Sequence, residues 1–249
     1  MSEAELHRLL CWGLIAIAAF TLIALFVMTA PYGRHARSGW GPKMPTRWGW
    51  IVMECPAVLV FAGCFFVGAH RFELVPLVLL ALWQFHYVYR TFVFPLKIGG
   101  PEKGMAVTVV AMGMGFNVLN AYLNARHVSQ LGVYSVSWLY DARFIAGAAL
   151  FLAGRALHVR VDAYLLELRR GGYAIPRQGA FRWVSCPNYL GEVIEWIGWA
   201  VATWSLAGAA FAIFTIANLA PRAHAHHRWY RERFADYPRE RKALIPFVW

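Results

Sequence analysis

The stretch FRWVSCPNYLGEVIEWIGW, residues Phe181–Trp199, decides the fold class of this chain. Its residues are typical of the first turns of a membrane helix. Ser185 or Cys186 can cap the first turn with a side chain, and Pro187 suits that turn because a missing N–H costs nothing there. The apolar residues that follow continue the helix into a nonpolar environment.

Three polar residues interrupt this apolar run. Asn188, Glu192 and Glu195 are spaced i, i+4 and i+7, which places them on one face of the helix. Two carboxylates on one side of a buried helix are costly, and such residues mark ligand pockets or ion paths. A hydrogen-bond network that ties neighbouring helices together explains the same pattern equally well. Spacing alone leaves both interpretations open.

The composition indicates a membrane protein. Of the 249 residues, 59% are hydrophobic and 15% are charged, which is too apolar for a soluble domain and enough for several membrane spans. Twelve Trp and eleven Tyr fit aromatic belts at two membrane interfaces. The net charge of +11 could suggest nucleic acid, but the cations lie in short links between apolar runs. We interpret them as topology signals and anion-binding groups, and we expect no nucleic-acid partner.

Other motifs exclude several further classes. The four cysteines form no CxxC pair, so we expect neither a disulfide framework nor a zinc site. The first apolar run is too long for a cleavable signal peptide, and Glu3 and Glu5 do not fit a basic leader. No GxGxxG follows a strand and no P-loop is present, which argues against a soluble nucleotide-binding fold.

Seven apolar runs predict seven transmembrane helices. The runs cover residues 9–30, 48–69, 72–92, 104–125, 141–161, 189–204 and 207–220. The links after the first, third and fifth runs carry most of the cations together with the tail from Arg222 to Trp249, so these segments should share the cytoplasmic side. We therefore expect an all-α integral membrane protein, one domain over residues 1–249, with its N-terminus outside and its C-terminus cytoplasmic. Its location would be the inner membrane in a bacterium or the endoplasmic reticulum in a eukaryote.

Four polar clusters lie within or beside these runs, three of them at or near the cytoplasmic side. An ionisable residue in mid-membrane indicates function, although a salt bridge between helix faces explains the third cluster equally well. Adjacent histidines on a helix point about 100° apart and no carboxylate stands at ligand spacing to them, so we expect no metal. Together the clusters suggest a phosphate-rich anionic cofactor that arginines and histidines clamp from the cytoplasmic side. The clusters are Glu54; Gln84, His86, Tyr87 and Arg90; Arg155, His158 and Asp162; and Arg222, His226 and Tyr230 with His227.

The C-terminal half resembles the steroid 5α-reductase (3-oxo-5α-steroid 4-dehydrogenase) family. The matching residues there are Tyr173, Ile175–Pro176, Gly179–Phe181, Val184–Ser185, Asn188–Glu192 and Glu195–Trp196, followed by almost all of the tail. In the N-terminal half, the resemblance rests on Pro31–His35 (a YGKH-like loop), on Glu54 with Pro56 (a QELP segment), and on His86–Tyr87 with Arg90–Thr91 (an HYxxRT segment). The resemblance covers most of the chain, and we expect a bacterial-type homologue.

The resemblance implies a seven-helix membrane reductase that uses NADPH on the Δ4 double bond of a 3-oxosteroid, adds hydride to C5 and gives a 5α-reduced product. Glu54 and Tyr87 would hold the substrate carbonyl oxygen, with residues 1–125 mainly on the substrate side and 140–249 mainly on the cofactor side. The partners implied are a steroid or other lipophilic enone and membrane lipid, with no obligate protein partner. The cofactor-binding residues implied are Gly33, Arg34, Arg90, His158, Asp162, Arg169, Tyr173, Asn188, Glu192, Glu195, Arg222, His226, Tyr230 and Arg241.

Three residues depart from the family pattern. Met53 stands where the steroid reductases carry Gln just before the glutamate. His158 stands where they carry Asn, four residues before the aspartate, and Ala174 stands where a cation is usual. These departures bear on carbonyl placement and on the clamping of the 2′-phosphate more than on the overall chemistry.

The two residues expected at the carbonyl suit the chemistry of an enone. Donors that stabilise the developing enolate oxygen polarise the double bond for hydride addition. The Tyr87 hydroxyl is such a donor at neutral pH, and Glu54 donates only when protonated, which a membrane interior favours. The α-carbon would then take a proton from water or from Tyr87.

Two other enzyme functions fit part of the sequence. Cys186–Gly191 is similar to the Asn/His-Pro-x-Tyr-x-Gly signature of isoprenylcysteine carboxyl methyltransferases, which use S-adenosylmethionine. Those enzymes carry a pair of glutamates where His226 and His227 stand here, and they match poorly around Glu54 and Tyr87, which favours the reductase. A reductase of another enone or enoyl lipid is the second alternative. A non-enzymatic sterol-binding protein would show no NADPH affinity.

Overall fold

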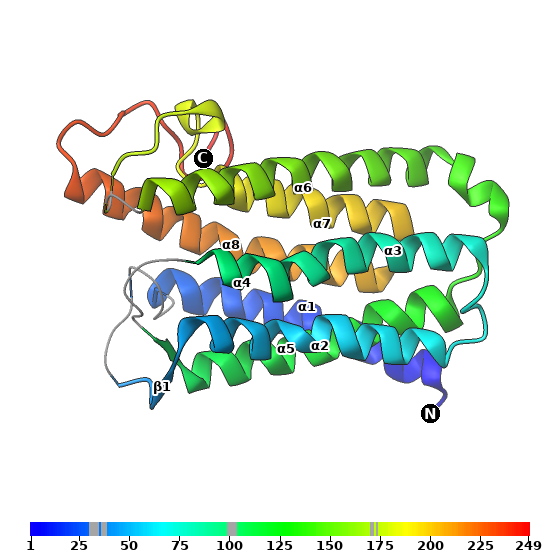
Figure 1. Cartoon of the computed structure of the whole chain (residues 1–249). Coiled ribbons are helices and arrows are strands. Elements are labelled where there is room, and N and C mark those ends of the chain that lie inside the picture. Colours follow the sequence, from blue (N-terminus) through cyan, green and yellow to red (C-terminus); the bar gives the residue numbers. More distant parts are fainter. Residues whose placement is uncertain (30–34, 36–38, 99–103, 170–171, 173) are drawn as a thin grey trace.

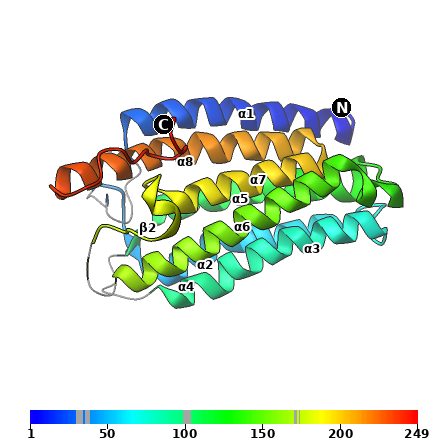
Figure 2. The ribbon, with the colours of Figure 1, turned by 90° about the horizontal axis from the view of Figure 1, so that it is seen from above.

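The computed structural model describes residues 1–29, 35, 39–98, 104–169, 172 and 174–249. Long helices run side by side along one axis and form an elongated bundle (Figures 1 and 2). These are α1 (Glu3–Val27), α2 (Thr46–Phe66), α3 (Leu74–Val88), α5 (Val107–Arg126), α6 (Ala142–Leu168), α7 (Pro187–Thr203) and α8 (Leu206–Arg233).

Short elements connect the long helices. A π-helical segment (Tyr89–Val93) and the short α4 (Phe94–Lys97) continue α3, and a second π-helical segment (His127–Leu131) continues α5. Two 3₁₀ turns, Val136–Tyr140 and Gly179–Arg182, precede α6 and α7. Strands β1 (Lys43–Met44) and β2 (Met105–Ala106) form one antiparallel pair, with Lys43 opposite Ala106 and Met44 opposite Met105.

The helices agree with an all-α membrane protein. Within the described residues, five helical stretches are long and apolar enough to cross a membrane, namely Glu3–Val27, Thr46–Phe66, Leu74–Lys97, Ala142–Leu168 and Leu206–Arg233. The other two long helices, α5 and α7, lie among them in the bundle (Figure 2). However, α7 has 17 residues and α5 carries three asparagines, so neither is apolar and long enough by itself. Seven spans and the orientation of the termini stay predictions.

The predicted links do share one end of the bundle. The last turns of α1, α6 and α8 and the first turns of α2, α5 and α7 lie at this end, which we call the cationic end (Figure 1). The N-terminus lies at the opposite end. There the side chain of Arg126 donates to Glu3 (2.6 Å), and the His7 ring donates to the carbonyl oxygen of Leu123 (2.8 Å), which join α1 to α5.

Several helix ends differ from the predicted ones. Helix α6 continues to Leu168 rather than residue 161, and α8 continues to Arg233 rather than residue 220, so the first part of the predicted basic tail is helical. The apolar runs stop early because charged residues interrupt both helices near the cationic end, namely Asp162 and Glu167 in α6 and Arg222, Arg228 and Arg231 in α8. Hydropathy therefore marks the lipid-facing part of a helix and not its hydrogen-bonded length.

Glycines set the distance between α6 and α7. A Cβ atom on Gly191 would lie 2.7 Å from the backbone nitrogen of His158, and one on Gly198 would lie 2.6 Å from the carbonyl oxygen of Gly147. Both distances are far below van der Waals contact, so only glycine lets the two backbones pass this closely. Small residues allow such close approach between membrane helices, where packing rather than the hydrophobic effect drives association.

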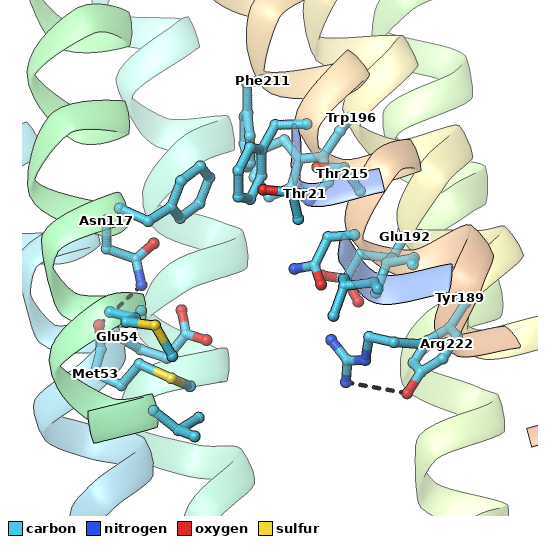
Figure 3. Close-up of a pocket in the computed structure, with 18 of the residues that line it drawn as sticks. Thr21, Met53, Glu54, Asn117, Tyr189, Glu192, Trp196, Phe211, Thr215 and Arg222 are labelled. Carbon is cyan, nitrogen blue, oxygen red and sulfur yellow. Dashed lines mark hydrogen bonds between the residues drawn. The ribbon is translucent and has the colours of Figure 1, made fainter. Parts of the chain in front are cut away.

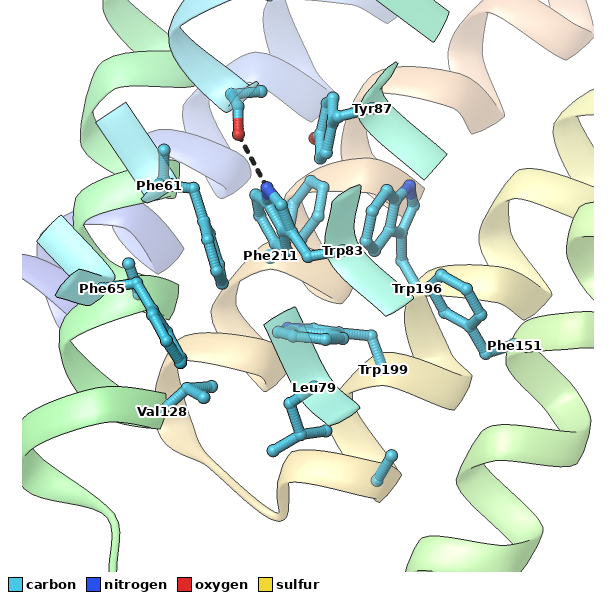
Figure 4. Packing of buried hydrophobic residues seen from close by; sticks show 14 of the residues in the cluster. Phe61, Phe65, Leu79, Trp83, Tyr87, Val128, Phe151, Trp196, Trp199 and Phe211 are labelled. Atoms are coloured by element: carbon cyan, nitrogen blue, oxygen red, sulfur yellow. Dashed lines mark hydrogen bonds between the residues drawn. The ribbon is translucent and has the colours of Figure 1, made fainter. Parts of the chain in front are cut away.

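Tryptophans fill the centre of the bundle. Trp83 of α3 stacks on Phe61 of α2, with ring centroids 4.4 Å apart, and lies 5.2 Å from Trp199 of α7 (Figure 4). The indole nitrogen of Trp83 donates to the carbonyl oxygen of Ala57 (2.7 Å), and that of Trp199 donates to the amide oxygen of Asn124 (2.7 Å). These bonds satisfy the polar atom of each buried indole and fix α2, α3, α5 and α7 relative to one another.

We predict that Gly198→Ala destabilises the protein, because the added methyl group forces α6 and α7 apart. Overpacking costs about 1–3 kcal/mol. Gly115→Ala in α5 is the matched control, since a Cβ there meets nothing within 4 Å and alanine favours a helix over glycine. Thermal unfolding of both variants in the same detergent measures the difference, and equal midpoints would contradict a tight α6–α7 contact.

Candidate functional site

A cavity of about 420 Å³ opens inside the bundle toward the cationic end. Helices α1, α2, α3, α5, α7 and α8 all contribute to its walls. Most of its lining is apolar, with Trp196, Phe211 and Phe116 at the inner end. Figure 3 shows this cavity with polar side chains on two facing walls.

The first wall is built by α2, α3 and α5. Glu54 and Met53 project from α2 and Asn117 from α5, and the three lie together in Figure 3. The amide nitrogen of Asn117 donates to the carbonyl oxygen of Met53 (2.8 Å), which fixes this part of the wall. Tyr87 of α3 is buried in the bundle and also lines the cavity. The cavity therefore brings together Glu54 and Tyr87, which lie in different helices.

The facing wall is built by α7 and α8. Tyr189 and Glu192 project from α7, and Arg222 from α8 donates to the hydroxyl oxygen of Tyr189 (3.2 Å; Figure 3). Behind it, Nε2 of His226 lies 3.1 Å from the same hydroxyl, and Nδ1 of His226 lies 3.1 Å from Nε2 of His35. This wall combines a carboxylate, a guanidinium and a hydroxyl, which are groups suited to a polar, anionic ligand.

A buried network lies between α3, α6 and α7. Glu195 is fully buried, and it accepts a hydrogen bond from Nδ1 of His86 (2.7 Å) and faces Nδ1 of His158 (3.4 Å). The other nitrogen of His158 lies 3.2 Å from Asp162, which also accepts from the amide of Asn188 (3.0 Å). Of the three polar residues on one face of α7, only Glu192 lines the cavity, and the other two bind this network. This face of α7 therefore contributes to the cavity through Glu192 and to the buried network through Asn188 and Glu195.

Arg90 connects the network to the cavity. It lies in the π-helical segment after α3 and lines the cavity, and its guanidinium donates to Asp162 (3.4 Å). The same guanidinium stacks over the Trp50 ring at 4.6 Å and the Phe94 ring at 4.9 Å. It is packed on aromatic faces rather than extended to the membrane interface, where long cationic side chains often place their charge.

Ser185 joins the C-terminal tail to the start of α7. Its hydroxyl lies 2.6 Å from both Nδ1 of His227 and the hydroxyl of Tyr237, and it donates to the carbonyl oxygen of Lys242 (3.0 Å). Ser185 is therefore occupied by the tail, and the N-cap of α7 is Cys186, whose side chain makes no capping bond. Burial raises the pKa of the Tyr237 phenol, which keeps it a neutral donor at neutral pH. Pro187 stands in the first turn as predicted.

Arg241 is a buried cation. Only 3% of it is exposed, yet its Nε and Nη1 atoms have no hydrogen-bond partner among the described residues. Its guanidinium lies 4.9 Å from the centre of the Tyr237 ring, and Tyr237 in turn stacks on Tyr230 at 5.4 Å. The position is near the start of α7, because Lys242 donates to the carbonyl oxygen of Trp183 (2.9 Å). A helix N-terminus beside unpaired guanidinium donors is an environment that favours an anion.

Comparison with known proteins identifies the family. The sequence profile of 3-oxo-5-alpha-steroid 4-dehydrogenase matches residues 103–249. The chain is 44% identical over 256 residues to steroid 5-alpha-reductase DET2 of Gossypium hirsutum, which covers 100% of this chain and 99% of the relative. It is 42% identical over 255 residues to 3-oxo-5-alpha-steroid 4-dehydrogenase 1 of Bos taurus, with the same coverage.

The chain belongs to the 3-oxo-5-alpha-steroid 4-dehydrogenase family. The human 3-oxo-5-alpha-steroid 4-dehydrogenase 1 is also similar, at 39% identity over 225 residues, or 87% of this chain and 85% of the relative. The family is one of oxidoreductases that act on CH–CH groups. The resemblance stated from the motifs is therefore confirmed, while the expectation of a bacterial type rests on the sequence alone.

Membership in this family does not assign the individual site residues, so their roles stay predictions. Of the residues expected in the site, five line the cavity: Glu54, Tyr87, Arg90, Glu192 and Arg222. Six others lie behind it or beside the start of α7: His158, Asp162, Asn188, Glu195, His226 and Arg241. Tyr230 stacks on Tyr237 near the tail, and Arg169 is exposed at the end of α6. Gly33, Arg34 and Tyr173 lie outside the described residues.

Some residues that line the cavity carry no obvious sequence signal. Thr21 of α1 and Thr215 of α8 face the inner end of the cavity beside Phe211 (Figure 3). A threonine in an apolar run is common because its hydroxyl can bond the preceding turn. Asn117 could have been found, because an amide within an apolar run needs a partner in the membrane.

We predict that Ser185→Ala loosens the tail. The change removes the common partner of Tyr237, which is buried, and of His227, which is partly buried, at a cost of about 1–3 kcal/mol. We expect a lower midpoint of thermal unfolding and faster proteolysis of the tail. Ser137→Ala is the matched control, because Ser137 is exposed and its hydroxyl bonds that of the neighbouring exposed Ser135. Equal proteolysis of wild type and Ser185→Ala would contradict the role given to this hydroxyl.

Proposed function

We propose that this protein reduces the Δ4 double bond of 3-oxosteroids with NADPH and gives 5α-reduced products. The observation that supports the proposal most directly is that one cavity has polar side chains on two facing walls. Glu54 and Tyr87 lie on one wall, and Glu192, Tyr189 and Arg222 lie on the other. Family membership supports the same reaction, because the relatives are named for it.

The size and lining of the cavity suit a steroid. Its volume of about 420 Å³ falls in the usual range for small-molecule sites, roughly 300–1,000 Å³. Rings of Trp196, Phe211 and Phe116 offer apolar surface to a rigid tetracyclic lipid, and only a few polar groups are placed to orient it. A small number of polar groups on an apolar wall is the pattern that gives such sites their specificity.

The residues present fit a dinucleotide with phosphate groups. Beside the start of α7, Arg241 has two buried donor nitrogens that no described residue pairs, and an anionic group would satisfy them. Arg222 on the cavity wall and Arg90 against Asp162 would add cations, and Glu192 would accept from a ribose or amide group. When bound, NADPH supplies the hydride that adds to the β-carbon, C5, of the enone.

Glu54 and Tyr87 would act at the substrate carbonyl. The Tyr87 hydroxyl and a protonated Glu54 donate hydrogen bonds to the 3-oxo oxygen, and these bonds strengthen as negative charge develops on that oxygen. The surrounding low-dielectric walls make each bond worth more than it is in water. The α-carbon, C4, then takes a proton from water or from Tyr87, so that one hydride and one proton are added in total.

Activity itself tests the proposal most simply. Purified protein is incubated without oxygen with NADPH and a Δ4-3-oxosteroid, and NADPH absorbance and product mass are followed. Loss of NADPH with a product heavier by two hydrogen atoms would support the proposal. Binding of S-adenosylmethionine without binding of NADPH would favour the methyltransferase alternative, and reduction of only non-steroidal enones would favour the other reductase.

We predict that Tyr87→Phe and Glu54→Leu each lower kcat by about 100-fold or more while NADPH still binds. The loss of one donor to a developing oxyanion has an effect of this size. Tyr134→Phe is the matched control, since Tyr134 is buried in the bundle and its hydroxyl bonds the carbonyl oxygen of Thr203 far from the cavity. Full activity of both site variants would refute the carbonyl assignment.

We predict that Arg241→Met weakens NADPH binding by about 10-fold or more, because hydrogen bonds to charged groups are among the strong ones. The protein without NADPH should keep its stability, because the guanidinium that is removed is buried and two of its nitrogens lack partners within the described part of the chain. Arg228→Met is the control, because Arg228 is exposed and pairs with Glu232 at 3.4 Å on the same helix. A loss of stability with unchanged NADPH affinity would make Arg241 structural.

A further inference from the structure

Three carboxylates and three cations form a largely buried cluster at one side of the cavity, which Glu192 and Arg90 line. The acids are Asp162, Glu192 and Glu195, and the cations are Arg90, Arg155 and, as argued next, His158. Arg155 lies 3.7 Å from Glu195 and donates to the carbonyl oxygen of Phe85 (2.9 Å). Buried charges persist in membrane proteins when they are paired in this way.

Both ring nitrogens of His158 face carboxylates. Nδ1 lies 3.4 Å from Oε2 of Glu195, and Nε2 lies 3.2 Å from Oδ2 of Asp162 and 3.9 Å from Oε2 of Glu192. An ionised carboxylate only accepts hydrogen bonds, so each nitrogen must carry a hydrogen. A neutral imidazole would direct a lone pair at one of these oxygens.

The neighbours keep the carboxylates of Glu195 and Asp162 ionised. Glu195 also receives a hydrogen bond from His86 and lies against Arg155, and Asp162 also receives bonds from Asn188 and Arg90. Among the described residues, the groups that contact these two acids are all donors. The second proton therefore belongs to His158 and not to either of these carboxyl groups.

We propose that His158 is a permanently protonated imidazolium that positions both halves of the reductase site. It ties Asp162, on the side expected to hold the cofactor, to Glu195, which holds His86 next to Tyr87 on α3. His86 and Tyr87 rings contact each other with centroids 4.7 Å apart, and Trp196 of α7 packs on both. The proposal rests on the proposed function, and it makes His158 a positioning residue rather than a group that touches the reacting atoms.

A metal ion is the competing occupant of this cluster. His86, His158 and Glu195 each offer one ligand atom, and these atoms lie within 4.8 Å of one another. A divalent ion among them would stand close to Arg155, whose Nη1 is 3.3 Å from Nδ1 of His86 and 3.7 Å from Glu195. It would also require one ring nitrogen of His158 to give up the hydrogen that faces a carboxylate. The geometry therefore points to protons rather than a metal.

Nitrogen NMR of the full-length protein with ¹⁵N-labelled histidine tests the protonation state directly. His158→Asn identifies the His158 signals. We expect both ring nitrogens of His158 to be protonated at neutral and mildly alkaline pH. A single protonated nitrogen at neutral pH would overturn the proposal, as would one equivalent of tightly bound metal per chain that His158→Asn removes.

Substitutions test the positioning role. His158→Asn should raise the KM for NADPH by about 10-fold or more, because a charged hydrogen-bond partner of Asp162 is lost. His7→Asn is the matched control and should leave KM unchanged. His7 is equally buried in a helix, and it bonds the carbonyl oxygen of Leu123 at the opposite end of the bundle. Equal effects of the two substitutions on KM would contradict the proposal.

Charge compensation separates positioning from simple packing. Glu195→Gln removes one negative charge and still accepts from His86, so it should partly rescue His158→Asn. If the two substitutions acted independently, the fold-loss in kcat/KM of the double variant would equal the product of the two single fold-losses. We expect the observed loss to be smaller than that product by about 5-fold or more. Independent, multiplicative losses would overturn the proposal. If the wild-type protein does not reduce a steroid, the proposed function is refuted. The NMR experiment still tests the protonation of His158 in that case, because it does not depend on activity.

Discussion

The close contact between α6 and α7 is the constraint on which the site depends. Glycines at Gly147, Gly154, Gly191 and Gly198 remove the side chains that would otherwise separate the two backbones. Only at this distance can short side chains such as those of Asp162 and Asn188 bond directly across the interface. The same contact fixes the position of α7 and therefore of the cavity wall that α7 forms.

The ion cluster is the second consequence of that contact. Burying ions is costly, and an unpaired buried ion would destabilise the protein by several kcal/mol. The α6–α7 interface satisfies this requirement for its two most buried acids, because Glu195 meets His86 and His158, and Asp162 meets His158 and Asn188. Such a cluster is rigid for the same reason: moving any one helix would leave charges without partners. Rigidity on this wall suits a site in which two ligands have to meet in one orientation.

Much of this arrangement could be predicted, but not all of it. The spacing of Asn188, Glu192 and Glu195 correctly placed them on one face, yet it could not say that Glu192 lines the cavity while Glu195 is closed off. That division depends on the opposing residues of α3 and α6, which spacing within α7 does not contain. Likewise, only three-dimensional packing brings Glu54 and Tyr87 to one cavity. The roles given to these residues came from family resemblance, and helix ends were missed where polar residues continue a helix past its apolar part.

The central claim is that one cavity holds the carbonyl of an enone on one wall and a hydride donor on the other. Reduction of a Δ4-3-oxosteroid with NADPH deuterated at the transferable position of the nicotinamide tests it most directly. The account predicts a 5α-reduced product that carries one deuterium at C5 and one solvent hydrogen at C4. A product without deuterium, or with the deuterium at C4, would contradict the account.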